Sequence, residues 1–145
     1  MDRSETERPD RQALDFELLF DSEHRVLLVR FGRSLSDGAI ANMQDAVQGF
    51  VQSRGRCPLI IDLSPVEAIE VSTQFLAALG RRKAVMYGER RFIVAPGAEI
   101  YGLARMFEMH QGTATGDEPV VLRSLEAAYQ ALGISEPGFA PVGPG

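Results

Sequence analysis

Cysteine, histidine and tryptophan are scarce in this chain. Its 145 residues include one cysteine, two histidines and no tryptophan. One cysteine cannot form a disulfide within the chain, and its reduced state suits the cytoplasm. The histidines, His24 and His110, have no cysteine or histidine at metal-ligand spacing, so we expect no metal site.

Basic charge and long apolar runs are also lacking. The net charge is −5 at pH 7, whereas nucleic-acid-binding domains show a basic face, so we expect no nucleic-acid partner. The apolar stretches are strand-sized and far too short to span a membrane. Residues 1–7 are polar and lack the apolar region of a signal peptide. We therefore predict a cytoplasmic protein that is not membrane-embedded.

Catalytic and phosphate-binding motifs are absent as well. The sequence has no Gly-x-Gly-x-x-Gly or Walker-type loop and no Gly-x-Ser-x-Gly elbow. We therefore predict that the chain is not an enzyme and needs no cofactor.

The length and composition predict one globular domain with irregular ends. Residues 1–13 are charged and lack periodicity, so we expect a mobile N-terminal arm. Residues 135–145 are rich in proline and glycine, which cannot sustain a helix or a strand ladder. The predicted domain therefore covers residues 14–134, followed by a flexible C-terminal tail.

Strand and helix patterns alternate within this domain. Residues 15–20 and 25–31 flank a short polar link and predict a hairpin. A helix follows, with Ser34 or Ser36 as its cap and Gly55 at its end. Its apolar residues recur with a helical period: Ile40, Met43, Val47, Phe50 and Val51.

Three further strand–helix pairs follow. Strands are predicted at residues 58–63, 91–95 and 120–122. The helices after them carry these inward residues: Phe75, Leu76 and Leu79; Ile100, Leu103, Ala104 and Phe107; Leu125, Ala128, Tyr129 and Leu132. The order ββαβαβαβα predicts an α/β fold, in which a mixed β-sheet has an opening hairpin and parallel βα crossovers.

The segment from Leu59 to Ser72 carries a family resemblance. Asp62-Leu63-Ser64 ends a buried strand, and Ser72 stands where the second helix begins. The segment resembles the STAS domain (sulphate transporter and anti-sigma factor antagonist). Members of that family share a strand ending in Asp-Leu-Ser and an Asp-Ser-Ser-Gly-Leu motif that opens the second helix.

Aligned from Asp62, the second helix keeps part of that motif. Ser72 matches the second serine. The other four positions differ from the family's residues: Glu70, Val71, Thr73 and Gln74. Together with the element order, the resemblance extends from about Phe16 to Leu132 and implies a single STAS-like domain.

The resemblance also implies a regulatory role and a protein partner. In that family a partner kinase, which is also an anti-sigma factor, commonly phosphorylates the second serine, and the complex then breaks. Ser72 is therefore the phospho-acceptor candidate, and Thr73 a second one. A phosphate adds about −1.5 to −2 charge at an exposed helix start. The simpler alternative is that Ser72 only caps the helix through the amide of Gln74 or Phe75.

Other residues are candidates for a partner surface. Asp62 is either a strand-end carboxylate that binds turn amides or one wall of a polar cleft with Ser64, Glu70 and Ser72. Tyr101 and Met106 fall off the apolar stripe of the third helix. The helix that begins at Ser72 and the third helix both follow parallel strands, so we expect the starts of these two helices to lie together and form a docking surface.

Three functions remain open from the sequence. The first is a protein-interaction module resembling anti-sigma factor antagonists, whose partner is an anti-sigma factor, a kinase-like protein or another regulatory protein. The alternative is a small-ligand or nucleotide-binding sensor, because the carboxyl ends of parallel strands commonly form ligand crevices. The third is an enzyme of lipid or nucleotide metabolism, for which the sequence shows no set of catalytic residues.

Overall fold

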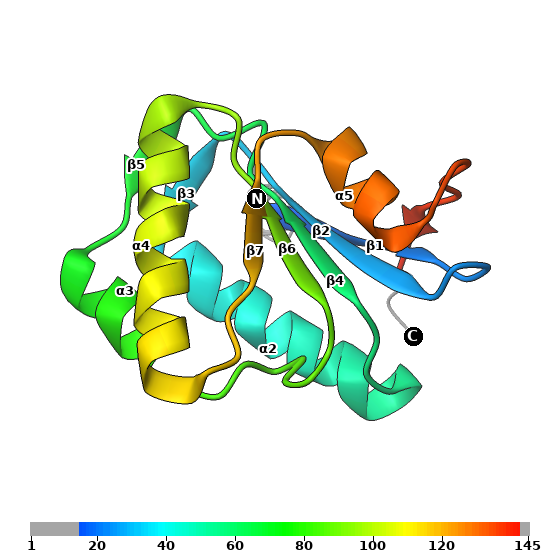
Figure 1. Ribbon diagram of the computed structural model, residues 1–145, viewed down its shortest axis with the longest axis horizontal. Coiled ribbons are helices and arrows are strands. Elements are labelled where there is room, and N and C mark those ends of the chain that lie inside the picture. The colour runs from blue at the N-terminus through cyan, green and yellow to red at the C-terminus, as the bar shows by residue number, and fades with distance from the viewer. Residues whose placement is uncertain (1–14, 143–145) are drawn as a thin grey trace, which may run out of the picture.

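A twisted six-stranded sheet runs through the computed structural model, which describes residues 15–142 (Figure 1). Its strand order is β7-β6-β4-β2-β1-β8. β2, β4, β6 and β7 run parallel, while β1 is antiparallel to both of its neighbours. The strands are β1 (Phe16–Asp21), β2 (Val26–Phe31), β4 (Leu59–Asp62), β6 (Arg91–Val94), β7 (Val120–Leu122) and β8 (Ala140–Pro141). The predicted α/β fold with a mixed sheet and an opening hairpin is confirmed, whereas the predicted arm at residues 1–13 lies outside the described residues.

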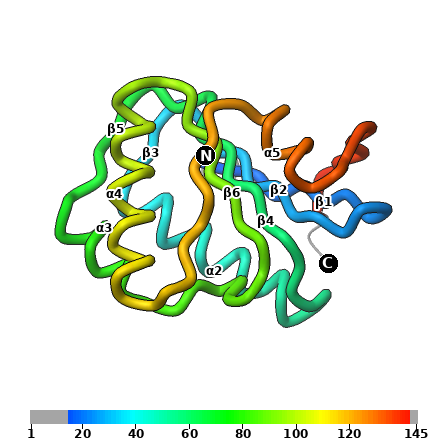
Figure 2. The backbone as a smooth tube through the Cα atoms, viewed as in Figure 1, coloured from blue at the N-terminus to red at the C-terminus, as the bar shows by residue number. Residues whose placement is uncertain are grey.

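Helices cover both faces of this sheet (Figures 1 and 2). One face carries α2 (Asp37–Arg54), α3 (Thr73–Gly80) and α4 (Ala98–Thr115), and the other carries α5 (Leu125–Leu132). Alternate strand residues supply the two cores, since Val29 points toward α2 and Leu28 toward α5. Each sheet face therefore has its own apolar layer.

Capping residues define the ends of these helices as the sequence suggested. Ser36 accepts a hydrogen bond from the amide of Ala39 (3.1 Å) and caps α2, which decides between Ser34 and Ser36. Ser124 caps α5 through the amide of Ala127 (3.1 Å). Gly55 ends α2 with φ of 88°, a conformation that favours glycine.

A second, two-stranded sheet was not predicted. β3 (Ser34–Ser36) pairs in parallel with β5 (Ala68–Glu70), and Ser36 lies opposite Glu70. Strands of three residues are too short to show a periodic pattern, so the sequence carries little sign of them. This small sheet brings the start of α2 next to the segment that leads into α3.

The end of α3 packs closely on α4 at Gly80. A Cβ atom on Gly80 would lie 2.5 Å from Cβ of His110 and 3.3 Å from the backbone nitrogen of Gln111. Real Cβ atoms essentially never show the shorter distance, so the two helices approach each other this closely only because residue 80 has no side chain.

Gly80→Ala is expected to lower the free energy of unfolding by about 1–3 kcal/mol, because the added methyl group forces α3 and α4 apart. Gly49→Ala in α2 is the matched control. Among the described residues, nothing lies within 4 Å of its added Cβ, so it should stabilise the protein by about 0.5–1 kcal/mol through helix propensity. Urea denaturation measures both changes. A stabilising Gly80→Ala substitution would show that the helices are not in contact there.

The C-terminal segment packs on the domain, in contrast to the prediction for residues 135–145. Ala140–Pro141 pairs with β1, and the amide of Gly138 donates to Oδ2 of Asp21 at 2.8 Å. The Phe139 ring stacks on Tyr129 with centroids 5.9 Å apart. The expectation that this stretch sustains no ladder is therefore wrong for residues 140–141. Pro141 fits because β8 is an edge strand, where the missing N–H of proline is tolerated.

Candidate functional site at the start of helix α3

Ser72 is exposed at the N-terminus of α3 and makes a capping bond. Its hydroxyl oxygen accepts a hydrogen bond from the amide of Phe75 at 3.1 Å. This is one of the two capping bonds that the sequence predicted, and it satisfies a helix amide that otherwise has no partner.

Asp37, the first residue of α2, holds Ser72 from the other side. Its Oδ1 accepts the backbone N–H of Ser72 at 3.0 Å, and its Oδ2 accepts the Ser72 hydroxyl at 3.0 Å. Both bonds end on a carboxylate, which makes them stronger than bonds between neutral groups. The start of α3 is thereby fastened to the start of α2.

Sequence reasoning missed Asp37. Its one sequence signal is an acidic residue in the first turn of a helix, directly after the Ser36 cap. That it faces Ser72 follows from the β3–β5 register, which places Ser36 opposite Glu70. The sequence predicted that the start of α4 lies beside Ser72, but the hydrogen bonds that Ser72 donates reach Asp37 at the start of α2 instead.

Glu70 and Thr73 flank Ser72 and are exposed. Two carboxylates make the surroundings of Ser72 acidic. Glu70 stands two residues before it in the sequence, and Asp37 lies within hydrogen-bond distance of it. We refer to Asp37, Glu70, Ser72 and Thr73 as the α3-start cluster. A phosphate added there meets like charge.

Asp62 is a buried strand-end carboxylate with 3% of its surface exposed. Its Oδ1 accepts the amide (3.0 Å) and the hydroxyl (2.6 Å) of Ser64, and its Oδ2 accepts Nε of Arg30 at 3.3 Å. These contacts confirm the interpretation that Asp62 binds the turn after β4. A docking partner can reach the exposed Ser64 but not the Asp62 carboxylate.

Tyr101 and Met106 lie on α4. The Tyr101 ring is half-buried beneath the Arg123 guanidinium, 4.4 Å from its centroid, and its hydroxyl accepts Nη1 of Arg105 at 3.3 Å. Met106 is 39% exposed, and Met109 is 65% exposed. Within residues 15–142 no hydrogen bond or ion pair joins these side chains to the α3-start cluster.

Residues 15–142 contain no group of three or more His, Cys, Asp or Glu side chains placed to hold a metal ion. Over the same residues, no helix combines the length and the apolar character needed to cross a membrane.

Comparison with known proteins found no matching family model and no matching curated protein. The resemblance to the STAS domain therefore stays a prediction that rests on Asp62-Leu63-Ser64, Ser72 and the order of the elements.

Proposed function

We propose that this chain is a cytoplasmic protein-binding regulator with a STAS-like fold, and that the α3-start cluster is part of its docking face. The observation that supports this proposal best is that Ser72 is exposed while its hydroxyl, together with its backbone N–H, links α3 to Asp37 of α2. A modification of that hydroxyl therefore changes both the charge and the attachment of one surface.

Phosphorylation of Ser72 would act on this link directly. The new Oγ–P bond replaces the O–H bond, so Oδ2 of Asp37 loses the hydroxyl donor at 3.0 Å, while Oδ1 keeps the backbone N–H of Ser72. The phosphate also places about −1.5 to −2 charge beside that carboxylate. The repulsion pushes the start of α3 away from α2, and a partner docked across the two helix starts loses its surface. Loss of the hydroxyl bond alone leaves the start of α3 held by the backbone N–H of Ser72.

The link between Ser72 and Asp37 can be tested by stability alone. Ser72→Asp keeps a capping oxygen but sets two carboxylates against each other, so it should cost about 1 kcal/mol or more. In an Asp37→Asn background, the side-chain amide introduced at position 37 can donate to the carboxylate introduced at position 72. This bond replaces the lost one, so Ser72→Asp should cost close to nothing there. Urea denaturation of the four proteins gives this coupling. Equal costs in both backgrounds would show that residues 37 and 72 do not interact.

Partner binding tests the function itself. A partner recovered from native lysate with the wild-type chain should bind Ser72→Ala as tightly as wild type and Ser72→Asp at least tenfold more weakly, because only the acidic variant disturbs the docked surface. Ser124→Asp is the matched control, since Ser124 caps α5 on the other sheet face with the same 3.1 Å bond.

Mass spectrometry of the native protein should find phosphate on Ser72. If wild type, Ser72→Ala and Ser72→Asp bind the partner equally and no phosphate is found, Ser72 is a helix cap only. A Ser124→Asp variant that weakens binding as much as Ser72→Asp would place the docking face elsewhere.

A further inference from the structure

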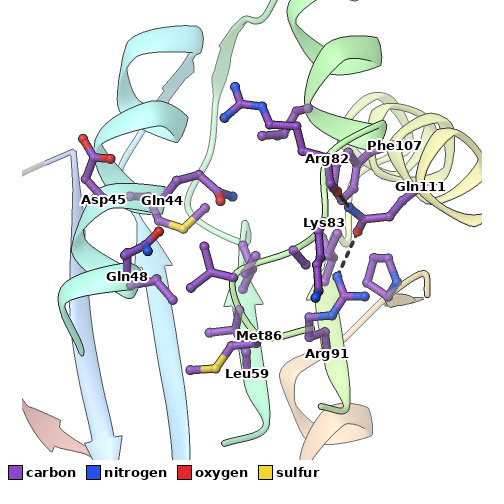
Figure 3. A pocket seen from close by; sticks show the side chains of 18 residues that line it. Gln44, Asp45, Gln48, Leu59, Arg82, Lys83, Met86, Arg91, Phe107 and Gln111 are labelled. Carbon is purple, nitrogen blue, oxygen red and sulfur yellow. Dashed lines mark hydrogen bonds between the residues drawn. The ribbon is translucent and has the colours of Figure 1, made fainter. Parts of the chain in front are cut away.

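A cavity of about 180 Å³ opens between α2 and the loop that joins α3 to β6 (Figure 3). Its apolar part is formed by α2, the strands β4 and β6, and α4 through these residues: Met43, Val47, Leu59, Ile61, Ile93 and Phe107. Protein interiors contain few voids larger than a water molecule. A void of this size is therefore a feature to be explained.

The cavity follows from how the helices share one sheet face. α3 packs closely on α4, and neither packs as closely on α2. A second apolar space of about 70 Å³ lies in the same gap, and both spaces are lined by Gln44 and Phe107. Phe107, predicted as a core residue, is accordingly only half-buried. The gap between α2 and α4 thus leaves two neighbouring spaces over β4 and β6 that share lining residues.

Arg91 brings a buried positive charge to this cavity. Its side chain is 6% exposed, and its Nη1 donates to Oε1 of Gln111 at 2.9 Å. Its Nη2 binds the carboxylate of Asp117 at 3.1 Å and also the backbone carbonyl of that residue. Among the described residues, 15–142, Nε of Arg91 has no hydrogen-bond partner. Buried donors nearly always have one, so this enclosed N–H leaves Arg91 with an unmet donor beside the cavity that its side chain lines.

Positive charge also dominates the rim. The exposed side chains of Arg82 and Lys83 line the cavity beside Arg91, and Asp45 on α2 is the acidic residue that lines it. Figure 3 shows Lys83, Arg91 and Gln111 on one side of the cavity and Asp45 on the other, while the guanidinium of Arg82 points away from Arg91. Asp117 pairs with Arg91, so the local excess comes from two rim cations, Arg82 and Lys83, against Asp45, in a chain whose net charge is −5.

We propose that this cavity binds a small carboxylate with a compact apolar body. The body fills the space between Met43 and Phe107, and the carboxylate accepts hydrogen bonds from Arg91 and Lys83. The size suits such a molecule, because an apolar cavity of roughly 150 Å³ binds benzene. Carboxylates bound to guanidinium groups form the stronger, charge-assisted class of hydrogen bond.

This site is independent of the proposed docking face. Leu59 and Arg91 are the first residues of β4 and β6, so the cavity lies near the amino ends of these parallel strands. Asp62 and the segment leading to Ser72 follow the carboxyl end of β4. From the sequence, a small-ligand site was expected at the carboxyl ends of the parallel strands. This cavity lies toward their amino ends instead.

The test is a titration of the full chain with benzoate and hexanoate, followed by amide chemical shifts in NMR spectra. Benzyl alcohol, hexanol and inorganic phosphate are the comparison probes. We expect both carboxylates to shift amides in residues 43–48 and 82–86. The alcohols should bind about tenfold more weakly, and phosphate should shift neither segment. Alcohols that bind as tightly as the carboxylates, or carboxylates that shift neither segment, would overturn the proposal.

Variants separate the cavity from general surface charge. Lys83→Gln should weaken carboxylate binding about threefold to tenfold and leave alcohol binding unchanged. Arg81→Gln removes the same charge two residues away at an exposed position that does not line the cavity, and it should have no effect. Equal weakening by the two variants would show that only surface charge attracts the probes.

A filled cavity should bind nothing. Gln44 is half-buried at the junction of the two spaces, so Gln44→Phe should abolish binding of carboxylates and alcohols, while Gln44→Met should retain it. Normal binding by a folded Gln44→Phe variant would overturn the assignment. If that variant does not fold, the comparison of Lys83→Gln with Arg81→Gln still decides.

Discussion

Truncation of Leu76 to alanine is expected to lower the free energy of unfolding by about 2–5 kcal/mol. Leu76 is 4% exposed on α3 and lines the 70 Å³ space in the gap between the helices. Removing its side chain loses apolar burial and enlarges a void that is already present. The short α3 helix has few other apolar residues to hold it, because only Leu76, Leu79 and Gly80 are buried within it.

Urea denaturation monitored by circular dichroism measures this loss. Leu132→Ala is the control, since it makes the same chemical change at a half-buried position on α5, and it should cost clearly less. A cost below about 1 kcal/mol for Leu76→Ala would mean that α3 does not pack on the sheet as described.

Removal of residues 135–145 is expected to lower the free energy of unfolding by about 2–4 kcal/mol. The deletion takes away the β8 ladder, the stacking of Phe139 on Tyr129, and the amide of Gly138 that binds Asp21. Asp21 is 1% exposed, so its carboxylate would lose one of the donors that compensate for its burial. If the domain ended at residue 134, as the sequence suggested, the deletion would not change the stability. Thermal denaturation of the full chain and of the chain without residues 135–145 distinguishes the two expectations.

Acid titration gives the truncation a second measurement. Burial raises the pKa of Asp21, but hydrogen bonds from the amides of Gly138 and His24 and from the His24 ring outweigh it and hold this pKa below its ordinary value. A lowered folded pKa stabilises the protein at neutral pH. That contribution is lost as pH falls below the ordinary aspartate value and through the lower folded one. The truncated chain lacks the Gly138 bond and should lose less stability over this acidic range, while Ser135→Ala should behave like wild type.

The parts of the fold that could be predicted from the sequence are those that a local pattern of residues encodes. The apolar period of residues 40–51 indicated α2, and the alternation of strands and helices indicated the mixed sheet. The Ser72 cap on Phe75 was also predictable, because serine before an apolar helical period is a local signal.

The remaining features depend on distances between elements, which no local pattern encodes. Asp37 reaches Ser72 across 35 residues, through a pairing of two strands that are each three residues long. The ladder at residues 140–141 was missed because proline and glycine indicate irregular structure. The exception requires knowing that this segment forms the edge strand of the sheet, beside β1. The cavity reflects the spacing between α2 and α4, whose lining residues come from several segments far apart in the sequence.

The pairing of β8 with β1 has a consequence for how the chain folds. Gly138 and Asp21 are 117 residues apart, so this contact closes a long loop and is favourable only after the intervening strands have formed. During synthesis, the outer edge of β1 stays open until residues 140–141 are available. An open strand edge is a template for pairing with another chain and a starting point for aggregation. By covering this edge at Leu19 and Phe20, the C-terminal segment is expected to limit self-association once the chain is complete, in addition to stabilising the fold.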